Sequence, residues 1–132
     1  MTTEDEVRLI VPATPEFLRL ARITAAGLAS RLGFTLDQVE DLRLAIDELC
    51  FGLTGPHGRD GVVRLSYIVR DDALEVRGEG QFEAAAVPTV ALELSELILN
   101  ALVDEHELST NNGRPRFRLI KRRATNGSTP TG

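Results

Sequence analysis

Residues 35–50 read TLDQVEDLRLAIDELC and carry the clearest structural signal in the chain. Thr35 and Gln38 have the spacing of a helix capping box, in which two side chains satisfy backbone N–H groups at the start of a helix. The apolar residues that follow recur every three or four positions: Val39, Leu42, Ile46, Leu49 and Leu53. This periodicity predicts an amphipathic helix with one face in a core.

The residues before this helix predict a strand and another helix. Residues 7–11, VRLIV, are typical of a strand that ends at Pro12. Thr14 and Pro15 suit the start of a helix, and Gly33 suits its end. The apolar residues between them share one helix face: Leu18, Ala21, Ala25, Leu28 and Leu32.

The second half of the chain predicts two hairpins and a third helix. Residues 52–61 are rich in glycine and proline and predict a loop. Residues 62–69 and 73–76 predict a hairpin, and an irregular stretch follows at 78–88. A third helix is predicted over 90–103, with Leu97 among its inward residues. Residues 107–110 and 117–121 predict a second hairpin, which turns at Asn112 and Gly113.

The order of these elements, βααββαββ, predicts an α+β two-layer sandwich. Three helices would cover one face of a mainly antiparallel, mixed sheet of about five strands. One domain is expected over residues 7–123, with unstructured ends at 1–6 and 124–132.

The composition of the 132 residues favours one globular domain, since 42% are hydrophobic and 27% are charged. No apolar run approaches the roughly 18 residues needed to cross a bilayer, and the first residues, MTTEDE, resemble no secretion signal. The single cysteine, Cys50, cannot form an internal disulfide. We therefore expect a cytoplasmic protein without a membrane partner.

The charge is uneven along the chain. Residues 114–132 hold six basic residues and no acid, although the whole chain has 15 Lys+Arg against 20 Asp+Glu. The acidic remainder argues against direct nucleic-acid binding as the main role. The basic end suits contact with RNA or with an acidic protein surface, and more simply a basic edge strand followed by a solvated tail.

Common chemical motifs are absent from the sequence. It has neither GxGxxG nor a Walker phosphate loop, and His57, His106 and Cys50 lack metal-ligand spacing. No metal site is therefore expected.

Residues 11–16, VPATPE, and 40–50, EDLRLAIDELC, resemble the RsbW-type family of anti-sigma factors and serine kinases, within the GHKL ATPase superfamily. The resemblance covers residues 7–122 and is most specific in the first fifty. It implies a Bergerat-like fold, with ATP and Mg²⁺ as the family's cofactors.

The resemblance also implies residue roles. The family's second helix carries a Glu that activates a partner's serine, and this Glu corresponds to Glu48 here. Four residues later the family has an Asn that binds Mg²⁺, where this chain has Gly52. The family's Asp-x-Gly, which reads adenine, corresponds to Gly78, Glu79 and Gly80. Glu79 and Gly80 are thus the cofactor-binding candidates, and Glu48 is the catalytic one.

Two further nucleotide elements of the family are altered. Its glycine box falls on residues 93–96, where Glu93 and Glu96 would repel phosphates. The Thr that follows the last hairpin glycine is replaced by Arg114. We therefore expect no cofactor, with ATP and Mg²⁺ as the ligands if the altered pocket still binds.

The resemblance implies a partner surface on the first helix. In the family, an Arg within the segment Ala-Arg-(Ile/Val)-Thr helps bind a sigma factor. This Arg corresponds to Arg22 here, and Arg19 lies three residues earlier. The leading hypothesis is an anti-sigma protein that sequesters a sigma factor and is released by an anti-anti-sigma (STAS) protein, as in partner switching in stress responses. The alternatives are an active serine/threonine kinase with Glu48 as base, and a relative with an unrelated partner. The family also suggests a homodimer through the sheet side.

Overall fold

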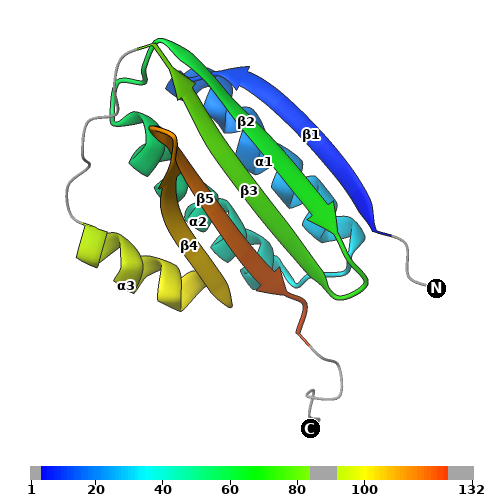
Figure 1. Ribbon diagram of the computed structural model, residues 1–132. Helices are drawn as coiled ribbons and strands as arrows, with labels where there is room; N and C mark the ends of the chain where they lie inside the picture. Colours follow the sequence, from blue (N-terminus) through cyan, green and yellow to red (C-terminus); the bar gives the residue numbers. More distant parts are fainter. Residues whose placement is uncertain (1–3, 84–91, 125–132) are drawn as a thin grey trace, which may run out of the picture.

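The computed structural model describes residues 4–83 and 92–124, with side chains in the third helix described from residue 96 onward (Figure 1). The elements follow the predicted order βααββαββ. They are β1 (Asp5–Pro12), α1 (Pro15–Arg31), α2 (Leu36–Thr54), β2 (Gly61–Val69), β3 (Ala73–Phe82), α3 (Leu92–Leu102), β4 (Glu105–Asn111) and β5 (Arg114–Arg122).

The five strands form one sheet in the order β1-β2-β3-β5-β4. Every pairing between these strands is antiparallel. Figure 1 shows all three helices on the same side of this sheet. The predicted α+β two-layer sandwich is therefore confirmed. None of the helices within the described ranges is long and apolar enough to cross a bilayer.

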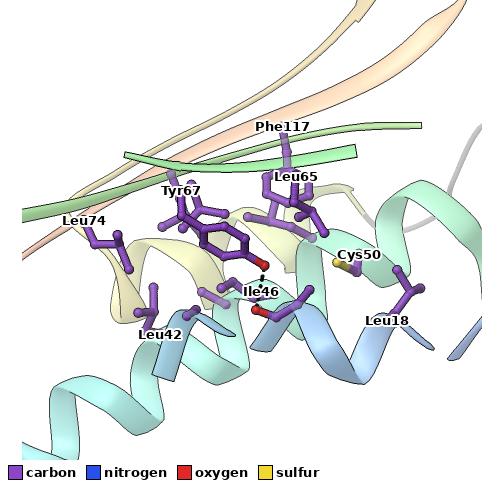
Figure 2. Packing of buried hydrophobic residues seen from close by; sticks show 14 of the residues in the cluster. Leu18, Leu42, Ile46, Cys50, Leu65, Tyr67, Leu74 and Phe117 are labelled. Carbon is purple, nitrogen blue, oxygen red and sulfur yellow. Dashed lines mark hydrogen bonds between the residues drawn. The ribbon is translucent and has the colours of Figure 1, made fainter. Parts of the chain in front are cut away.

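The core lies between the sheet and the helices (Figure 2). Leu42, Ile46 and Leu65 are fully buried there. Tyr67 enters the core from β2 and donates its hydroxyl to the Ala21 carbonyl of α1 at 2.8 Å, which satisfies the polar end of a buried ring. Cys50 is also buried, and this burial, with a smaller effect of Asp47, raises the pKa of its thiol to about 12.

Local signals in the sequence produce the expected ends and turns. Gln38 N donates to Thr35 Oγ1 at 3.1 Å, and Thr35 N donates to Gln38 Oε1 at 3.0 Å, which confirms the capping box. Asn112 and Gly113 have φ values of 54° and 79°. Positive φ at both residues of a two-residue loop is typical of a type I′ turn between antiparallel strands.

Two boundaries in the first half differ from the prediction. β1 begins at Asp5, because Asp5 pairs with Val69 in the sheet, so this residue and Glu6 are not part of an unstructured end. α2 continues to Thr54, three residues into the predicted loop. Burial of Thr54, and its hydroxyl bond to the Cys50 carbonyl at 3.1 Å, stabilise this extra turn.

The second half needs larger corrections. β3 extends through Gly78 to Phe82, where an irregular stretch was predicted, because β2 pairs with it to Phe82 and β5 pairs with it as far as Glu79. β5 lies inside the sheet and is not an edge strand. Leu97 was predicted to face inward, but it is 68% exposed. Most of the predicted irregular stretch beyond Glu83, and nearly all of the predicted 124–132 tail, lie outside the described residues.

Candidate functional site

Glu48 and Gly52 lie one turn apart on α2, as the resemblance requires of the catalytic and metal positions. Glu48 is half-buried. A Cβ at Gly52 would meet no atom within 4 Å, so packing does not require glycine here. Glycine nevertheless supplies no oxygen ligand for Mg²⁺. Among the residues that the structure describes, no three His, Cys, Asp or Glu side chains are grouped to hold a metal.

Aromatic rings fill the space beside the two glycines of β3. Gly78 lies opposite Phe117 of β5, and a Cβ on Gly78 would fall 2.6 Å from Cζ of the Phe117 ring. A Cβ on Gly80 would similarly fall 2.5 Å from Cε2 of Phe82. Real Cβ atoms essentially never approach other atoms so closely. In the correspondence that the resemblance implies, the side chain of the family's adenine-reading Asp would meet the Phe117 ring here.

The structure does not bring Glu79 together with Glu48. Successive residues of a strand point to opposite faces of a sheet. Gly78 faces the buried helix side, so Glu79 faces the other side, between Arg64 and Arg116 on the neighbouring strands. The main chain of Gly80 lies in the β2–β3 ladder opposite Val63.

The predicted glycine-box position falls within α3. Glu96 is exposed on this helix, whereas the side chain of Glu93 lies outside the described part. The helix starts at Leu92, so the segment that would approach phosphates is regular helix from there. Residues 93–96 form the first turn of α3, where backbone N–H groups have no intrahelical partner, but Glu96 places a negative charge there that repels phosphates. Together with Gly52 and Phe117, this arrangement does not fit Mg²⁺-ATP.

Arg22 of α1 pairs with Asp47 of α2. Its Nη1 donates to Asp47 Oδ2 at 2.7 Å, and both side chains are partly exposed. The ion pair joins the two helices where they run side by side. Arg19 is exposed on α1, one turn before Arg22.

Large apolar side chains are exposed on the two helices that this ion pair joins. Leu20 and Ile23 of α1 are 42% and 54% exposed, and Leu44 and Phe51 of α2 are 53% and 50% exposed. Together with two arginines of α1, these side chains make up the α1–α2 surface: Arg19, Leu20, Arg22, Ile23, Leu44 and Phe51. Apolar side chains interspersed with arginine are typical of the centre of protein–protein interfaces.

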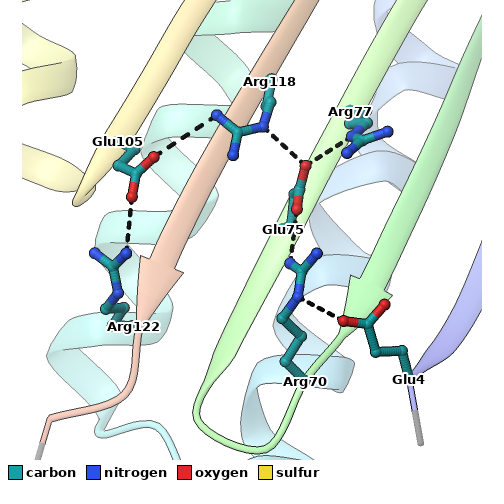
Figure 3. Close-up of polar contacts among 7 residues, drawn as sticks. All are labelled: Glu4, Arg70, Glu75, Arg77, Glu105, Arg118 and Arg122. Atoms are coloured by element: carbon teal, nitrogen blue, oxygen red, sulfur yellow. Dashed lines mark hydrogen bonds and ion pairs between the residues drawn. The ribbon is translucent and has the colours of Figure 1, made fainter.

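A second polar centre, which the sequence did not reveal, lies on the sheet face away from the helices (Figure 3). Glu75 of β3 is only 1% exposed and accepts hydrogen bonds from Arg70 at 2.6 Å, Arg77 at 2.7 Å and Arg118 at 2.9 Å. Burial alone would raise the pKa of Glu75, but the hydrogen bonds from the three arginines outweigh it and lower the pKa to about 2. The alternation of β3 hinted that Glu75 faces away from Leu74 and Val76. Arg70 and Arg77 are near it in sequence, but Arg118 comes from the distant strand β5.

Comparison with models of protein families finds no match. Comparison with curated proteins finds serine-protein kinase RsbW of Bacillus pumilus, 30% identical over 133 aligned positions that cover 84% of this chain and 82% of that protein. RsbW of Bacillus subtilis is 37% identical over 75 residues, covering 54% of this chain and 47% of that protein. RsbW of Listeria monocytogenes is 36% identical over 80 residues, covering 58% and 50%.

The two-layer fold, with Glu48 on its second helix, thus has its relatives among bacterial serine-protein kinases. The match to the Bacillus pumilus protein extends over most of both chains. The chain belongs to the RsbW family.

Proposed function

We propose that this protein is an anti-sigma regulator that acts by binding its partners, without kinase activity. It sequesters a sigma factor on the α1–α2 surface, and an anti-anti-sigma protein of the STAS type releases it. The observation that carries this proposal is the exposure of Leu20, Ile23, Leu44 and Phe51 on the two helices that the Arg22–Asp47 pair joins. Burying such side chains against a partner is favourable, at about 25 cal/mol per Å² of apolar surface.

The nucleotide elements support binding in preference to phosphorylation. Gly52 lacks a metal-binding oxygen, Phe117 fills the space next to Gly78, and Glu79 faces the wrong side of the sheet. A kinase needs Mg²⁺ to bridge and neutralise the phosphates of ATP during transfer. A protein that only occupies its partners has no such requirement.

The proposal is tested by recovering partners from the native cell with the tagged full chain and identifying them by mass spectrometry. We expect a sigma factor, and we expect Ile23→Glu to abolish its recovery. Leu97→Glu is the matched control, since Leu97 is an equally apolar, 68% exposed residue on α3. Recovery of neither a sigma factor nor a STAS protein, or equal losses in the two variants, would contradict the proposal.

An active serine/threonine kinase is the second candidate, and the half-buried Glu48 on α2 favours it. In that function Glu48 accepts the proton of the attacking serine hydroxyl. Incubation with Mg²⁺-ATP and a STAS partner distinguishes the two functions. Phosphoserine on the partner that disappears in Glu48→Ala would establish the kinase, whereas unmodified partner supports binding alone.

A further inference from the structure

Asp47 of α2 occupies part of the guanidinium of Arg22. The Nη1 atom of Arg22 donates to Asp47 Oδ2 at 2.7 Å. Arg22 belongs to the α1–α2 surface, where the proposed function places the sigma factor. The two side chains are 30% and 44% exposed, so a partner can reach both of them. The surface therefore offers a partner an arginine that already holds a carboxylate of its own chain.

The contact between Arg22 and Asp47 leaves most of the guanidinium unused. A guanidinium has five N–H donors, and a paired fork on a carboxylate uses two nitrogens and two oxygens. Here the hydrogen bond joins one nitrogen to one oxygen. Arg22 therefore keeps donors for another acceptor, and its geometry allows a second carboxylate to replace the first.

The neighbouring charges do not draw Asp47 away from Arg22. Arg43 lies one turn before Asp47 on α2, but its guanidinium pairs with Glu40 at 2.7 Å. Arg19 lies one turn before Arg22 on α1, is exposed, and forms no ion pair with any residue in the described ranges. Within those ranges, Arg22 is the one cation that Asp47 pairs with.

A carboxylate of a partner that approaches Arg22 meets the negative charge of Asp47 on the same guanidinium. A partner that covers Ile23, Leu44 and Phe51 also expels water from this part of the surface. Repulsion between two like charges grows as water leaves, because the local dielectric constant falls. The presence of Asp47 should therefore weaken the contact between Arg22 and an acidic side chain of the partner.

We propose that Asp47 is a built-in competitor for Arg22. An acidic side chain of the sigma factor takes Arg22 from Asp47 when the complex forms, and Asp47 recaptures Arg22 when the complex dissociates. This inference rests on the proposed function and adds to it a residue that sets how easily the partner is released. Such a complex dissociates faster than one made by an unpaired arginine, which suits a sigma factor that a STAS protein has to free.

A role for Asp47 in orienting Arg22 for the partner fits the contact less well. Glu75 shows what a carboxylate that fixes arginines looks like in this protein, since it is 1% exposed and accepts hydrogen bonds from three of them. Asp47 is 44% exposed and accepts one hydrogen bond from Arg22. The two roles predict opposite effects, because neutralising an orienting Asp47 would weaken partner binding and neutralising a competitor would strengthen it.

Biolayer interferometry with the full chain and the sigma factor recovered with it tests the proposal. We expect Asp47→Asn to lower the Kd about threefold, mainly through slower dissociation, since a partly exposed charge contributes modestly. Arg22→Gln binds more weakly and is followed at higher sigma-factor concentrations. Adding Asp47→Asn to it should leave the Kd unchanged, because the effect of Asp47 requires Arg22. Asp37→Asn is the matched control, since it removes the same charge from an exposed residue in the first turn of α2.

Chemical labelling tests the same pair without a partner. Phenylglyoxal reacts with guanidinium groups, and mass spectrometry of peptides from the labelled protein reports each arginine separately. We expect Asp47→Asn to raise the labelling of Arg22 and to leave that of Arg19 unchanged. Arg19 is the internal control, because it lies on the same helix, is exposed and forms no ion pair in the described part of the chain.

Three results would overturn the proposal. These are an unchanged or higher Kd for Asp47→Asn, equal tightening with and without Arg22, and unchanged labelling of Arg22 in Asp47→Asn. Failure of the proposed function has a different signature, in which the wild-type protein and every variant bind no sigma factor. That result would overturn the competitor role as well, but Arg22 labelling would still rise in Asp47→Asn and show that Asp47 shields this arginine.

Discussion

The ring of Phe117 on β5 packs directly over Gly78 on the adjacent strand β3. The two residues are paired across the strands, and a Cβ on Gly78 would lie 2.6 Å from the Cζ atom of the ring. The contact has two consequences. It closes the core between the sheet and the helices, where Phe117 is 2% exposed. It also leaves no room for a side chain at Gly78, the position that the sequence resemblance assigns to the family's adenine-reading Asp.

Alanine substitutions at two glycines should change stability in opposite directions. Gly78→Ala should destabilise the protein by about 2 kcal/mol, because overpacking a well-filled core forces strained rotamers or backbone shifts. Gly52→Ala should stabilise it by up to about 1 kcal/mol, because nothing lies within 4 Å of its Cβ and alanine favours helix. Urea denaturation measures both changes. A destabilised Gly52→Ala variant would show that α2 needs glycine at this position.

Restoring the missing metal ligand should not restore nucleotide binding. Gly52→Asn places an amide oxygen one turn after Glu48, in space that the structure leaves open. Phe117 still fills the space next to Gly78, so the adenine acceptor remains absent. Calorimetry should therefore detect no heat of Mg²⁺-ATP binding for either the wild-type protein or the variant, with a MgCl₂ titration as control. Micromolar ATP binding by the wild-type protein would contradict the binding-only function.

Arg22 should contribute to partner binding beyond its pair with Asp47. Arg22→Ala and Asp47→Ala both remove the 2.7 Å ion pair, and each should cost about 0.5 kcal/mol of stability, as partly exposed pairs do. Only Arg22→Ala removes the guanidinium offered to the sigma factor. We expect this variant to lose the recovered sigma factor and Asp47→Ala to retain it. Equal retention in both variants would limit Arg22 to holding the two helices together.

Glu75 should make the stability of the protein depend on acidic pH. Its pKa is lowered from 4.5 to about 2 in the folded state, so its ionised form stabilises the fold above about pH 4.5. This contribution, about 3 kcal/mol from the size of the shift, should disappear as the pH falls through 4.5 towards 2.

Glu75→Gln tests this dependence. The wild-type protein should exceed the variant in free energy of unfolding at pH 7, and the difference should shrink steadily below pH 4.5 when urea titrations are repeated at each pH. Glu79→Gln is the matched control, because Glu79 lies four residues along the same strand face and is more exposed than Glu75. A difference that stays constant down to pH 2.5 would mean that the Glu75 charge does not stabilise the fold.

Local signals in the sequence were sufficient for the order of the elements and for several of their ends. The Thr35–Gln38 capping box and the Asn112–Gly113 turn each involve residues within a few positions of one another, and the structure confirms both. The apolar periodicity of α1 and α2 likewise predicted their buried faces. Signals of this kind depend on backbone geometry that repeats over one helical turn or two strand residues.

The tertiary structure alone decided which distant residues meet. The glycines of β3 were predicted to break regular structure, yet pairing with β2 keeps Gly78 and Gly80 in a strand, and Gly78 also pairs with β5. Likewise, the position of β5 between β3 and β4 placed an expected edge strand inside the sheet. Three contacts depend on strand order and helix packing: Phe117 with Gly78, Arg22 with Asp47, and Arg118 with Glu75. A cap or a turn is specified by residues close together in the sequence, whereas a contact between distant residues leaves no signal in the sequence around either of them.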